Sequence, residues 1–412
     1  MESLTESQQH AWDLLQGENP VFLTGEAGSG KSFLVRRLTR SQDPKVFPVL
    51  ASTGAAAVLV GGRTLHSYLG LGILEGGVDR AVAKALGDRR VVRRVKKARG
   101  LIIDEISMIS GETLSAAEAV CRMAKEEQLP WGGMKVIAVG DFAQLPPVER
   151  YRQGTPDWAF RSRTWRETEF KPALLRQNLR TGNPEFLEVL NSVRKGEVSP
   201  LVRDFLKDRN RPVPEEFEGT RLYPRRIQAE KHNETRLDRL RGKVHHFPST
   251  YSGESRYIAA MKKYSPLPEE LKLKEGALVM LRQNDPRGRW VNGSTGVLVG
   301  ITNDSLIIDL LSGRKIEIEK TTFSLLDAEG KVRASVTNFP VILAWAATIH
   351  KSQGMTLDRM AVDLANLWEP GQAYVALSRI TDPNNLWLTS WQENSVRADP
   401  VVTQFYQEMG SK

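Results

Sequence analysis

A glycine-rich segment near the N-terminus, residues 25–32, limits this chain to a small set of folds. It fits the pattern of a glycine, four residues and Gly-Lys-Ser, between an apolar run at 21–24, an expected strand, and an expected helix from Ser32 to Leu38. The backbone N–H groups of such a loop turn inward onto phosphate oxygens, and the helix dipole adds positive charge. The sequence therefore predicts a nucleoside triphosphate site formed by Gly25, Ala27, Gly28, Ser29, Gly30, Lys31 and Ser32, with the Ser32 hydroxyl on Mg²⁺.

Two carboxylates follow the next strongly apolar run. Residues 101–103 have the form of a buried parallel strand, and Asp104 and Glu105 come directly after them. Such a strand delivers acidic side chains to the carboxyl edge of its sheet. Phosphate-loop ATPases use a first acid there to hold Mg²⁺ and a second to orient or deprotonate the attacking water. We therefore expect Asp104 to ligate Mg²⁺ and Glu105 to activate water.

Two glutamines flank this site in the sequence. Gln144 follows a third expected strand, residues 135–139, where its amide could sense a γ-phosphate, and the Pro-Pro pair at 146–147 stiffens the chain beside it. Gln8 lies in the first turn of an expected helix, and its amide could read an adenine edge. A glutamine at that position is also typical of a plain surface residue.

Length and composition bound the remaining choices. A chain of 412 residues predicts two main domains, and no apolar run approaches the roughly 20 residues that span a bilayer. The polar, acidic N-terminus argues against a secretory signal or transit peptide. A single cysteine, Cys121, leaves no internal disulfide and no cysteine-based zinc site, so we expect a reducing intracellular compartment, the cytoplasm. The net charge of +9 suits a polyanionic partner.

Two stretches read as insertions into the main pattern. Residues 70–98 are glycine-punctuated and then basic, without a strong apolar stripe, which predicts a small surface insertion. Its crowded Lys and Arg residues suit nucleic acid, although a solvated helix face explains them equally well. Residues 244–336 contain short β-type runs between turn signals, which predicts a small barrel. His66 and Tyr68 could contact a nucleic acid strand, but each, judged singly, is more often a packed core residue.

Taken together, the motifs resemble those of superfamily-one DNA helicases of the 5′-to-3′ branch, and within it the PIF family (petite integration frequency helicases). The resemblance runs from Leu4 to about Leu388 and keeps the family's motif order. The run from Val120 to Lys135 resembles the stretch that separates this family from its relatives. The matching motifs are Gly25–Ser32, Asp104–Met108, Gly140–Val148, Leu175–Gln177, Thr348–Asp358 and Tyr374–Arg379.

The resemblance implies an α/β fold with two RecA-like domains and ATP in the cleft between them. The first domain would comprise residues 1–66 and 99–170 with a wedge insertion at 67–98. The second would comprise residues 171–243 and 336–412 with an SH3-like barrel at 244–335. Arg176 and Arg379 would reach across from the second sheet as arginine fingers. Lys31, Glu105 and Gln144 would complete the catalytic set, with Gln8 and Gly354 as further nucleotide contacts.

The resemblance also implies that the chain translocates 5′-to-3′ on single-stranded DNA and unwinds duplex ahead of it, with junctions between single and double strands as partners and no membrane. G-quadruplex DNA and an RNA–DNA hybrid stay open as further substrates, and the free protein would be a monomer. The strand would contact Thr53, Gly54, Thr64, His66, Tyr68, Pro146, Pro147, Trp290, Asn292, His350, Lys351 and Ser352.

Two other readings fit part of the pattern. A helicase subunit of a recombination nuclease would share the motifs, but the Val120–Lys135 stretch favours the PIF family. An ATP-gated protein that clamps nucleic acid without unwinding would share the phosphate loop. Such a clamp does not need the complete hydrolytic set of Glu105, Arg176 and Arg379, so the motor is favoured.

Overall fold

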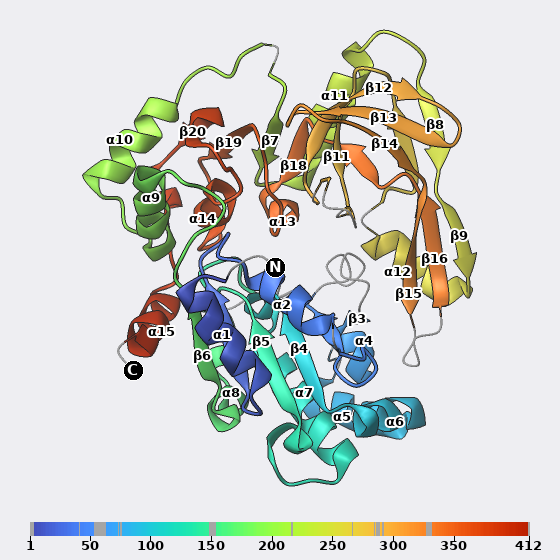
Figure 1. Ribbon diagram of the computed structural model, residues 1–412, viewed down its shortest axis with the longest axis vertical. Helices are drawn as coiled ribbons and strands as arrows, with labels where there is room; N and C mark the ends of the chain where they lie inside the picture. The colour runs from blue at the N-terminus through green and yellow to red at the C-terminus, as the bar shows by residue number, and fades with distance from the viewer. Residues whose placement is uncertain are drawn as a thin grey trace.

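The structure, a computed structural model, describes residues 4–40, 42–52, 63–72, 74, 76–147, 154–215, 217–265, 267–283, 285, 289, 290, 292–326 and 332–410. The chain forms two parallel sheets, one in the lower and one in the upper half of Figure 1, and a β-rich unit beside the upper sheet. This arrangement confirms the predicted α/β class. None of the described helices is long and apolar enough to cross a membrane.

The first sheet carries the phosphate loop, and we call the part of the chain built on it the first domain. Its strand order is β3-β2-β4-β5-β1-β6, and every pairing is parallel. The central strands are buried along almost their whole length because helices cover both faces. The strands are β1 (Val21–Gly25), β2 (Val49–Ala51), β3 (Arg63–Thr64), β4 (Gly100–Asp104), β5 (Lys135–Val139) and β6 (Lys171–Leu175).

Residues 70–98, which we predicted to lack a strong apolar stripe, contain the helices α5 and α6 of the first domain. That prediction is wrong, because Val91 and Val95 of α6 are 1% and 0% exposed. One helical turn separates these two valines, so α6 packs on α7 while the rest of its surface stays basic. The helices are α1 (Glu6–Gln16), α2 (Lys31–Thr39), α4 (Leu65–Leu69), α5 (Gly77–Gly87), α6 (Arg89–Lys97), α7 (Gly111–Lys125) and α8 (Arg163–Thr168).

A second parallel sheet has the order β18-β7-β19-β20, and the part of the chain built on it is the second domain. Its strands are β7 (Thr220–Tyr223), β18 (Ala346–Thr348), β19 (Met360–Leu364) and β20 (Leu386–Trp391). Its helices are α9 (Pro184–Lys195), α10 (Pro200–Arg209), α11 (Arg226–Arg239), α13 (Ile349–Ser352) and α14 (Gln372–Leu377).

In its described residues, the β-rich unit contains three small antiparallel sheets and one helix, α12 (Ser255–Tyr264). The largest sheet joins β11 (Leu278–Leu281), β12 (Thr295–Ile301), β13 (Ser305–Leu310), β14 (Lys315–Glu319) and β17 (Val341–Leu343). The other two join β9 (Thr250–Gly253), β15 (Thr321–Leu326) and β16 (Val332–Asn338), and β8 (His245–Pro248) and β10 (Glu270–Leu273). Closure of these strands into an SH3-like barrel stays a prediction.

Three elements lie outside the domains to which the predicted boundaries assign them. β6 belongs to the first sheet, because it pairs with β1 from Val21↔Lys171 to Gly25↔Leu175. β17 belongs to the β-rich unit, where it pairs with β11. The C-terminal helix α15 (Pro400–Gly410) packs against the first domain, where the Phe405 ring stacks on the Phe160 ring at 4.3 Å between centroids (Figure 1).

Candidate nucleotide site and nucleic-acid surface

The phosphate loop joins β1 to α2 and is enclosed by two other segments. Gly28 and Gly30 have positive φ angles of 87° and 94°, and any side chain there would collide with a neighbour. A Cβ on Gly28 would lie 2.6 Å from Arg180 Cβ, and one on Gly30 would lie 2.5 Å from Gln8 Nε2. Both positions therefore need glycine for its left-handed backbone and for space.

Lys31 begins α2, and its ammonium group lies within the loop. Its Nζ donates hydrogen bonds to the carbonyl oxygens of Gly25 at 2.7 Å and Glu26 at 2.9 Å. Burial lowers the pKa of Lys31, while the nearby carboxylates of Asp141 and Glu105 oppose that shift. A phosphate group is therefore a better partner for this buried cation than the carbonyl oxygens it contacts here.

Asp104 and Glu105 lie at the carboxyl edge of the first sheet, as predicted. Asp104 Oδ1 accepts a hydrogen bond from the Glu105 N–H at 2.9 Å, and burial together with the Glu105 charge raises the pKa of Asp104 to about 7. Glu105 has a left-handed backbone with φ of 53°. Its Oε2 accepts a hydrogen bond from Nε2 of Gln353 at 3.1 Å. Gln353 follows α13, so this bond joins the two domains.

The chemistry of Ser32 and Asp104 suits Mg²⁺. One hydroxyl and one carboxylate are typical of sites in which the substrate phosphates and water supply the remaining ligands. Within the described ranges, no group of three or more His, Cys, Asp or Glu residues could hold a metal ion without such help. The donor set therefore fits a metal that arrives with the nucleotide.

The prediction that Arg176 is an arginine finger of the second domain is wrong. It follows β6 directly, so it extends from the first sheet and not the second, and it is exposed. Its backbone N–H donates a hydrogen bond to Ser7 Oγ at 3.4 Å. The strand pairing of β6, which no local pattern reveals, decides this position. Arg176 is therefore not placed to reach across from the second domain.

Arg180, four residues later, contacts the phosphate loop instead. Its segment is held to the loop by Asn178 Nδ2, which donates to Ala27 O at 2.8 Å, and by the Leu179 N–H, which donates to Gly28 O at 2.9 Å. The Arg180 guanidinium donates to Ser378 O, next to Arg379. Arg180 thus links the phosphate loop to the motif that carries the second predicted finger. Sequence reasoning missed it, although the run Gln177-Asn178-Leu179-Arg180 offers a second arginine.

Arg379 is fully enclosed within the second domain. Its guanidinium donates to the carbonyl oxygens of Val375, Ser352 and Met355 and to the hydroxyl of Ser378. Burial, with the Arg180 charge as a further cause, lowers the pKa of Arg379 to about 9. The side chain therefore ties the Thr348–Asp358 motif to α14, and it would have to leave these carbonyls to contact a phosphate.

A buried polar cluster joins both domains beside the loop. Asp141 forms an ion pair with Arg194 of α9 at 2.8 Å and accepts hydrogen bonds from the hydroxyls of Tyr374 at 3.3 Å and Tyr406 at 3.0 Å. The Tyr374 hydroxyl in turn accepts a hydrogen bond from the Ala27 N–H at 2.9 Å. Although burial alone would raise it, the pKa of Asp141 lies below its usual range because of Arg194. The loop is thus connected to α9, α14 and α15 through one carboxylate.

We expect Asp141→Asn to lower the free energy of unfolding by about 3–5 kcal/mol, because it leaves the Arg194 guanidinium buried without its counter-charge. The pKa of Asp141 is depressed on folding, so its contribution is present above the pKa of the unfolded carboxyl and is lost as pH falls through the folded value. Urea denaturation at neutral and acidic pH measures both effects. Asp204→Asn, on the exposed side of α10, is the control. Equal stability of the two variants would contradict the role given to this cluster.

The remaining predicted nucleotide contacts lie near the loop. Gln8 is 3% exposed; its Nε2 donates to Ser29 O at 3.3 Å, and its Oε1 accepts from the Thr5 N–H. Gln144 is 7% exposed in the loop after β5. Gly354 follows α13 with φ of 76°. An adenine-reading role for Gln8 and a γ-phosphate role for Gln144 stay predictions.

Of the strand contacts predicted in the first domain, Thr53 and Gly54 lie outside the described residues. Thr64 caps α4 by accepting the Ser67 N–H at 3.1 Å, and His66 is half-buried with a pKa lowered by burial. Tyr68 does not fit the prediction, because its side chain is 5% exposed and its ring lies under the Arg94 guanidinium. Pro146 and Pro147 are also buried. Thr64 and His66 are therefore the accessible pair.

In the second domain, His350 and Lys351 of α13 are accessible, whereas Ser352 is not. The Ser352 hydroxyl is buried and donates to Ile349 O at 2.8 Å. The His350 ring stacks on the Trp368 ring at 6.3 Å between centroids. The Lys351 residue as a whole is exposed, while partial burial of its ammonium group and then the Arg226 charge lower its pKa.

The β-rich unit meets this surface near Asn292 and Gly293. Trp290 is 6% exposed in the core, so it is not placed to contact the strand as predicted, whereas Asn292 is half-buried. A Cβ on Gly293 would lie 3.0 Å from Met355 Cβ. Arg282, which sequence reasoning missed, is buried beside them. Its Nη1 lies 3.7 Å from Met355 Sδ, and burial lowers its pKa to about 10.

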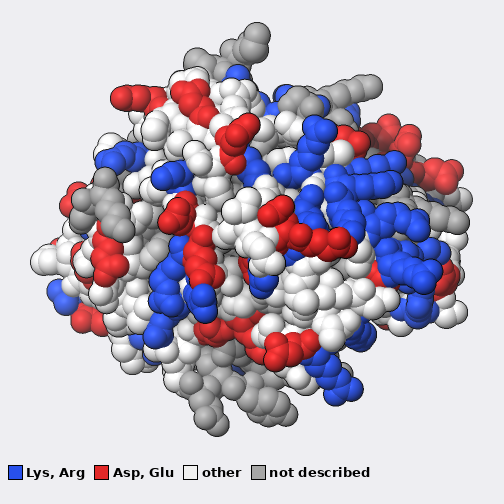
Figure 2. Space-filling model, turned by 90° about the horizontal axis from the view of Figure 1, so that it is seen from below, with Lys and Arg blue, Asp and Glu red and all other residues white. Residues whose placement is uncertain are grey.

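A basic surface lies on α6, at the far side of the first domain. Figure 2 shows Lys and Arg gathered on the right of the face seen from below, the side on which α6 lies in Figure 1. An open hollow of about 560 Å³ there is lined by Leu86, Arg89, Val92, Arg93, Lys96 and Lys97. Lys96 also pairs with Glu126 at 2.6 Å. Most of the predicted basic run therefore lies on one exposed face, while Arg94 is half-buried over the Tyr68 ring.

Comparison with known proteins agrees with this geometry. A family model for PIF1-like helicases matches residues 3–203, and a helicase model matches residues 320–399. The chain is 50% identical over 405 residues to the ATP-dependent DNA helicase Pif1 of Bdellovibrio bacteriovorus, covering 98% of this chain and 92% of that protein. It is 36% identical to ATP-dependent DNA helicase PIF1 of Xenopus laevis, covering 96% of this chain and 62% of that protein.

Solved structures give the same answer. The crystal structure of Bacteroides sp. Pif1 in complex with ADP-AlF4 matches 100% of this chain and 98% of its own, with a TM-score of 0.87 and 28% identity. The complex of Bacteroides Pif1 with ADP-AlF3 and single-stranded DNA matches the same shares with a TM-score of 0.69 and 29% identity. The chain therefore belongs to the PIF1-like helicases, a family of ATP-dependent DNA helicases.

Proposed function

We propose that this chain translocates 5′-to-3′ along single-stranded DNA and separates the duplex ahead of it at the expense of ATP. The observation that carries the proposal is the hydrogen bond between Gln353 of the second domain and Glu105 of the first, at 3.1 Å. Glu105, the carboxylate expected to activate water, accepts this hydrogen bond from a residue of the opposite domain. The rate of hydrolysis and the relative position of the two domains therefore depend on each other.

The proposed nucleotide is ATP with Mg²⁺, held by Lys31, Ser32 and Asp104. The ion, when bound, neutralises charge that develops on the phosphate oxygens. Glu105 would orient or deprotonate the water, and Arg180 and Arg379 would stabilise the transferred phosphoryl group. All six side chains come from one chain, which supports a monomer as the working unit.

The proposed strand crosses both domains. It would pass over His350 and Lys351 on the second domain and over Thr64 and His66 on the first, with Lys351 binding phosphate without regard to sequence. The relative solved with single-stranded DNA supports this partner. Opening one base-pair step costs about 1.4 kcal/mol, which nucleotide-driven domain motion would supply. We extend the proposal to G-quadruplex DNA and RNA–DNA hybrids, since backbone binding discriminates weakly between strands.

The test is ATP-dependent separation of one duplex that carries a 5′ tail, a 3′ tail or no tail. We expect the protein to unwind only the 5′-tailed form, and Lys31→Ala, which removes the ammonium from the phosphate loop, to unwind none. Unwinding of the 3′-tailed form would overturn the polarity and leave the ATPase assignment intact. Stimulation of ATP hydrolysis by DNA without any unwinding would overturn strand separation and leave translocation to be measured.

A further inference from the structure

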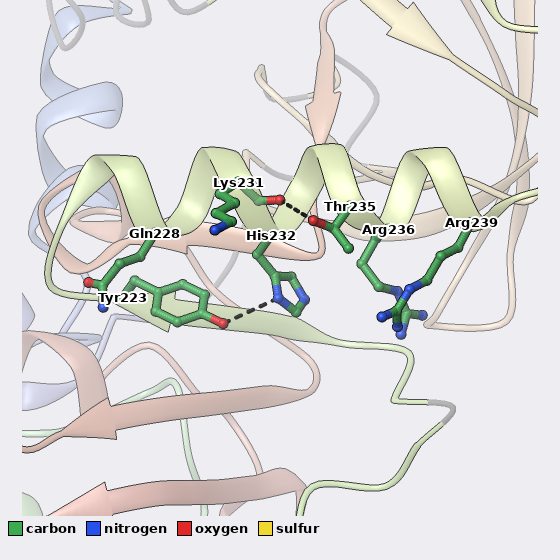
Figure 3. A pocket seen from close by; sticks show the side chains of 7 residues that line it. All are labelled: Tyr223, Gln228, Lys231, His232, Thr235, Arg236 and Arg239. Carbon is green, nitrogen blue, oxygen red and sulfur yellow. Dashed lines mark hydrogen bonds between the residues drawn. The ribbon is translucent and has the colours of Figure 1, made fainter.

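The helix α11 separates its charges onto two faces. Its basic and neutral polar side chains recur at spacings of three and four residues, which places them along one side of a helix. Its acids, Glu230, Glu234 and Asp238, follow their own row on another side. The polar side lines an open pocket of about 350 Å³ formed by Tyr223, Gln228, Lys231, His232, Thr235, Arg236 and Arg239 (Figure 3).

This pocket gathers positive charge without a counter-charge. No carboxylate lines it, and within the described part of the chain neither Lys231 nor Arg236 nor Arg239 forms an ion pair. Figure 3 shows the arginine side chains leaving the same side of α11. His232 cannot carry further charge, because burial and then Arg221, Arg236 and Arg239 lower its pKa to about 4. Like charges held together destabilise a fold unless an anion binds between them.

The donors in the pocket match the phosphate group of a nucleotide. A guanidinium can bind two phosphate oxygens at once, and an ammonium adds a point charge. The Tyr223 hydroxyl and His232 Nδ1 lie 3.2 Å apart in a hydrogen bond, which joins β7 to α11 within the pocket (Figure 3). A volume near the low end of known ligand sites admits a phosphate with its sugar.

The pocket is continuous with the surface to which the strand is assigned. Tyr223 ends β7, next to β18, and β18 leads directly into His350 and Lys351. The N-terminal Arg226 of α11 is close enough to Lys351 to lower the pKa of its ammonium. The neighbouring Arg225 lies 5.9 Å from the Trp368 ring on which His350 stacks. The N-terminal end of α11 therefore lies beside α13, and it brings Arg225, Arg226 and Glu230, which pairs with Arg226 at 2.5 Å.

We propose that the α11 pocket binds backbone phosphates of the same single strand, beyond the part that contacts the two domains at α13. The inference rests on the proposed function, because it takes His350 and Lys351 as part of the strand's path. The α11 pocket would lengthen the binding site, so its removal would weaken the binding of long strands and leave the binding of short strands unaltered.

The test uses Arg236→Gln with Arg239→Gln, which keeps a polar side chain at each position and removes two charges. Fluorescence anisotropy would measure the affinity for a short and a long deoxythymidine oligonucleotide against salt concentration. Each lost phosphate contact on a single strand lowers the slope of log affinity against log salt by about 0.7. We therefore expect the slope for the long strand to fall by roughly 1.4 and the slope for the short strand to stay unchanged.

The matched control is Arg161→Gln with Arg166→Gln, which removes two charges from the exposed surface around α8, and it should alter neither slope. Because Arg236 also lies 5.8 Å from the Trp345 ring, Lys231→Glu on the exposed side of the pocket is the second variant. A long-strand slope equal to wild type in both pocket variants, or an equal fall for both lengths, overturns the proposal. If the wild-type protein does not bind the short strand at all, that result would instead refute the proposed function.

Discussion

Glu105→Gln is expected to lower the rate of ATP hydrolysis by about 10²–10⁴-fold, the usual contribution of a positioned general base. The substitution removes the charge but keeps the shape, so the hydrogen bond with Gln353 at 3.1 Å can persist with the amide oxygen as acceptor. Nucleotide affinity should therefore stay within a few-fold of wild type. Steady-state phosphate release and titration with a fluorescent ATP analogue measure the two quantities.

Glu112→Gln serves as the control for this experiment, because Glu112 is an exposed carboxylate on α7 of the same domain. It should leave both hydrolysis and binding unchanged. Near-normal turnover in Glu105→Gln would sink the assignment of the water-activating group. Loss of nucleotide binding would show that the carboxylate organises the loop, where Lys31 already feels its charge.

A second large effect should distinguish two arginines only four residues apart. Arg180→Ala is expected to reduce DNA-stimulated ATP hydrolysis by about 10³–10⁵-fold, as loss of an arginine finger does. Arg176→Ala should stay within a few-fold of wild type. The reason is their placement: Arg180 is half-buried against Gly28 and Ser378, whereas Arg176 is exposed beyond β6. Both variants remove one arginine, so each controls for the charge of the other.

Phosphate release at saturating single-stranded DNA measures this pair of variants, and strand binding without nucleotide confirms that each still folds. A strong loss in Arg176→Ala with little change in Arg180→Ala would reverse the assignment. Equal, large losses in both would indicate that the segment between β6 and α9 acts as a unit.

Local sequence patterns determined the nucleotide half of the site. The phosphate loop, the apolar run before Asp104 and Glu105, and the glutamine after β5 each depend on residues close together in the chain. A tight glycine turn at a helix N-terminus, or acids at the end of a buried strand, need no distant partner to be recognised. The same holds for β5, whose bounds match the predicted 135–139.

Tertiary structure alone decided which side chains reach the site from elsewhere. Only the pairing of β6 with β1 places Arg176 on the first sheet and brings Arg180 to the loop. Only packing buries Tyr68 and Trp290. Only the return of α15 brings Tyr406 to Asp141. Strand pairing and burial depend on residues far apart in sequence, so a local sequence pattern cannot predict which strands pair or which side chains are buried.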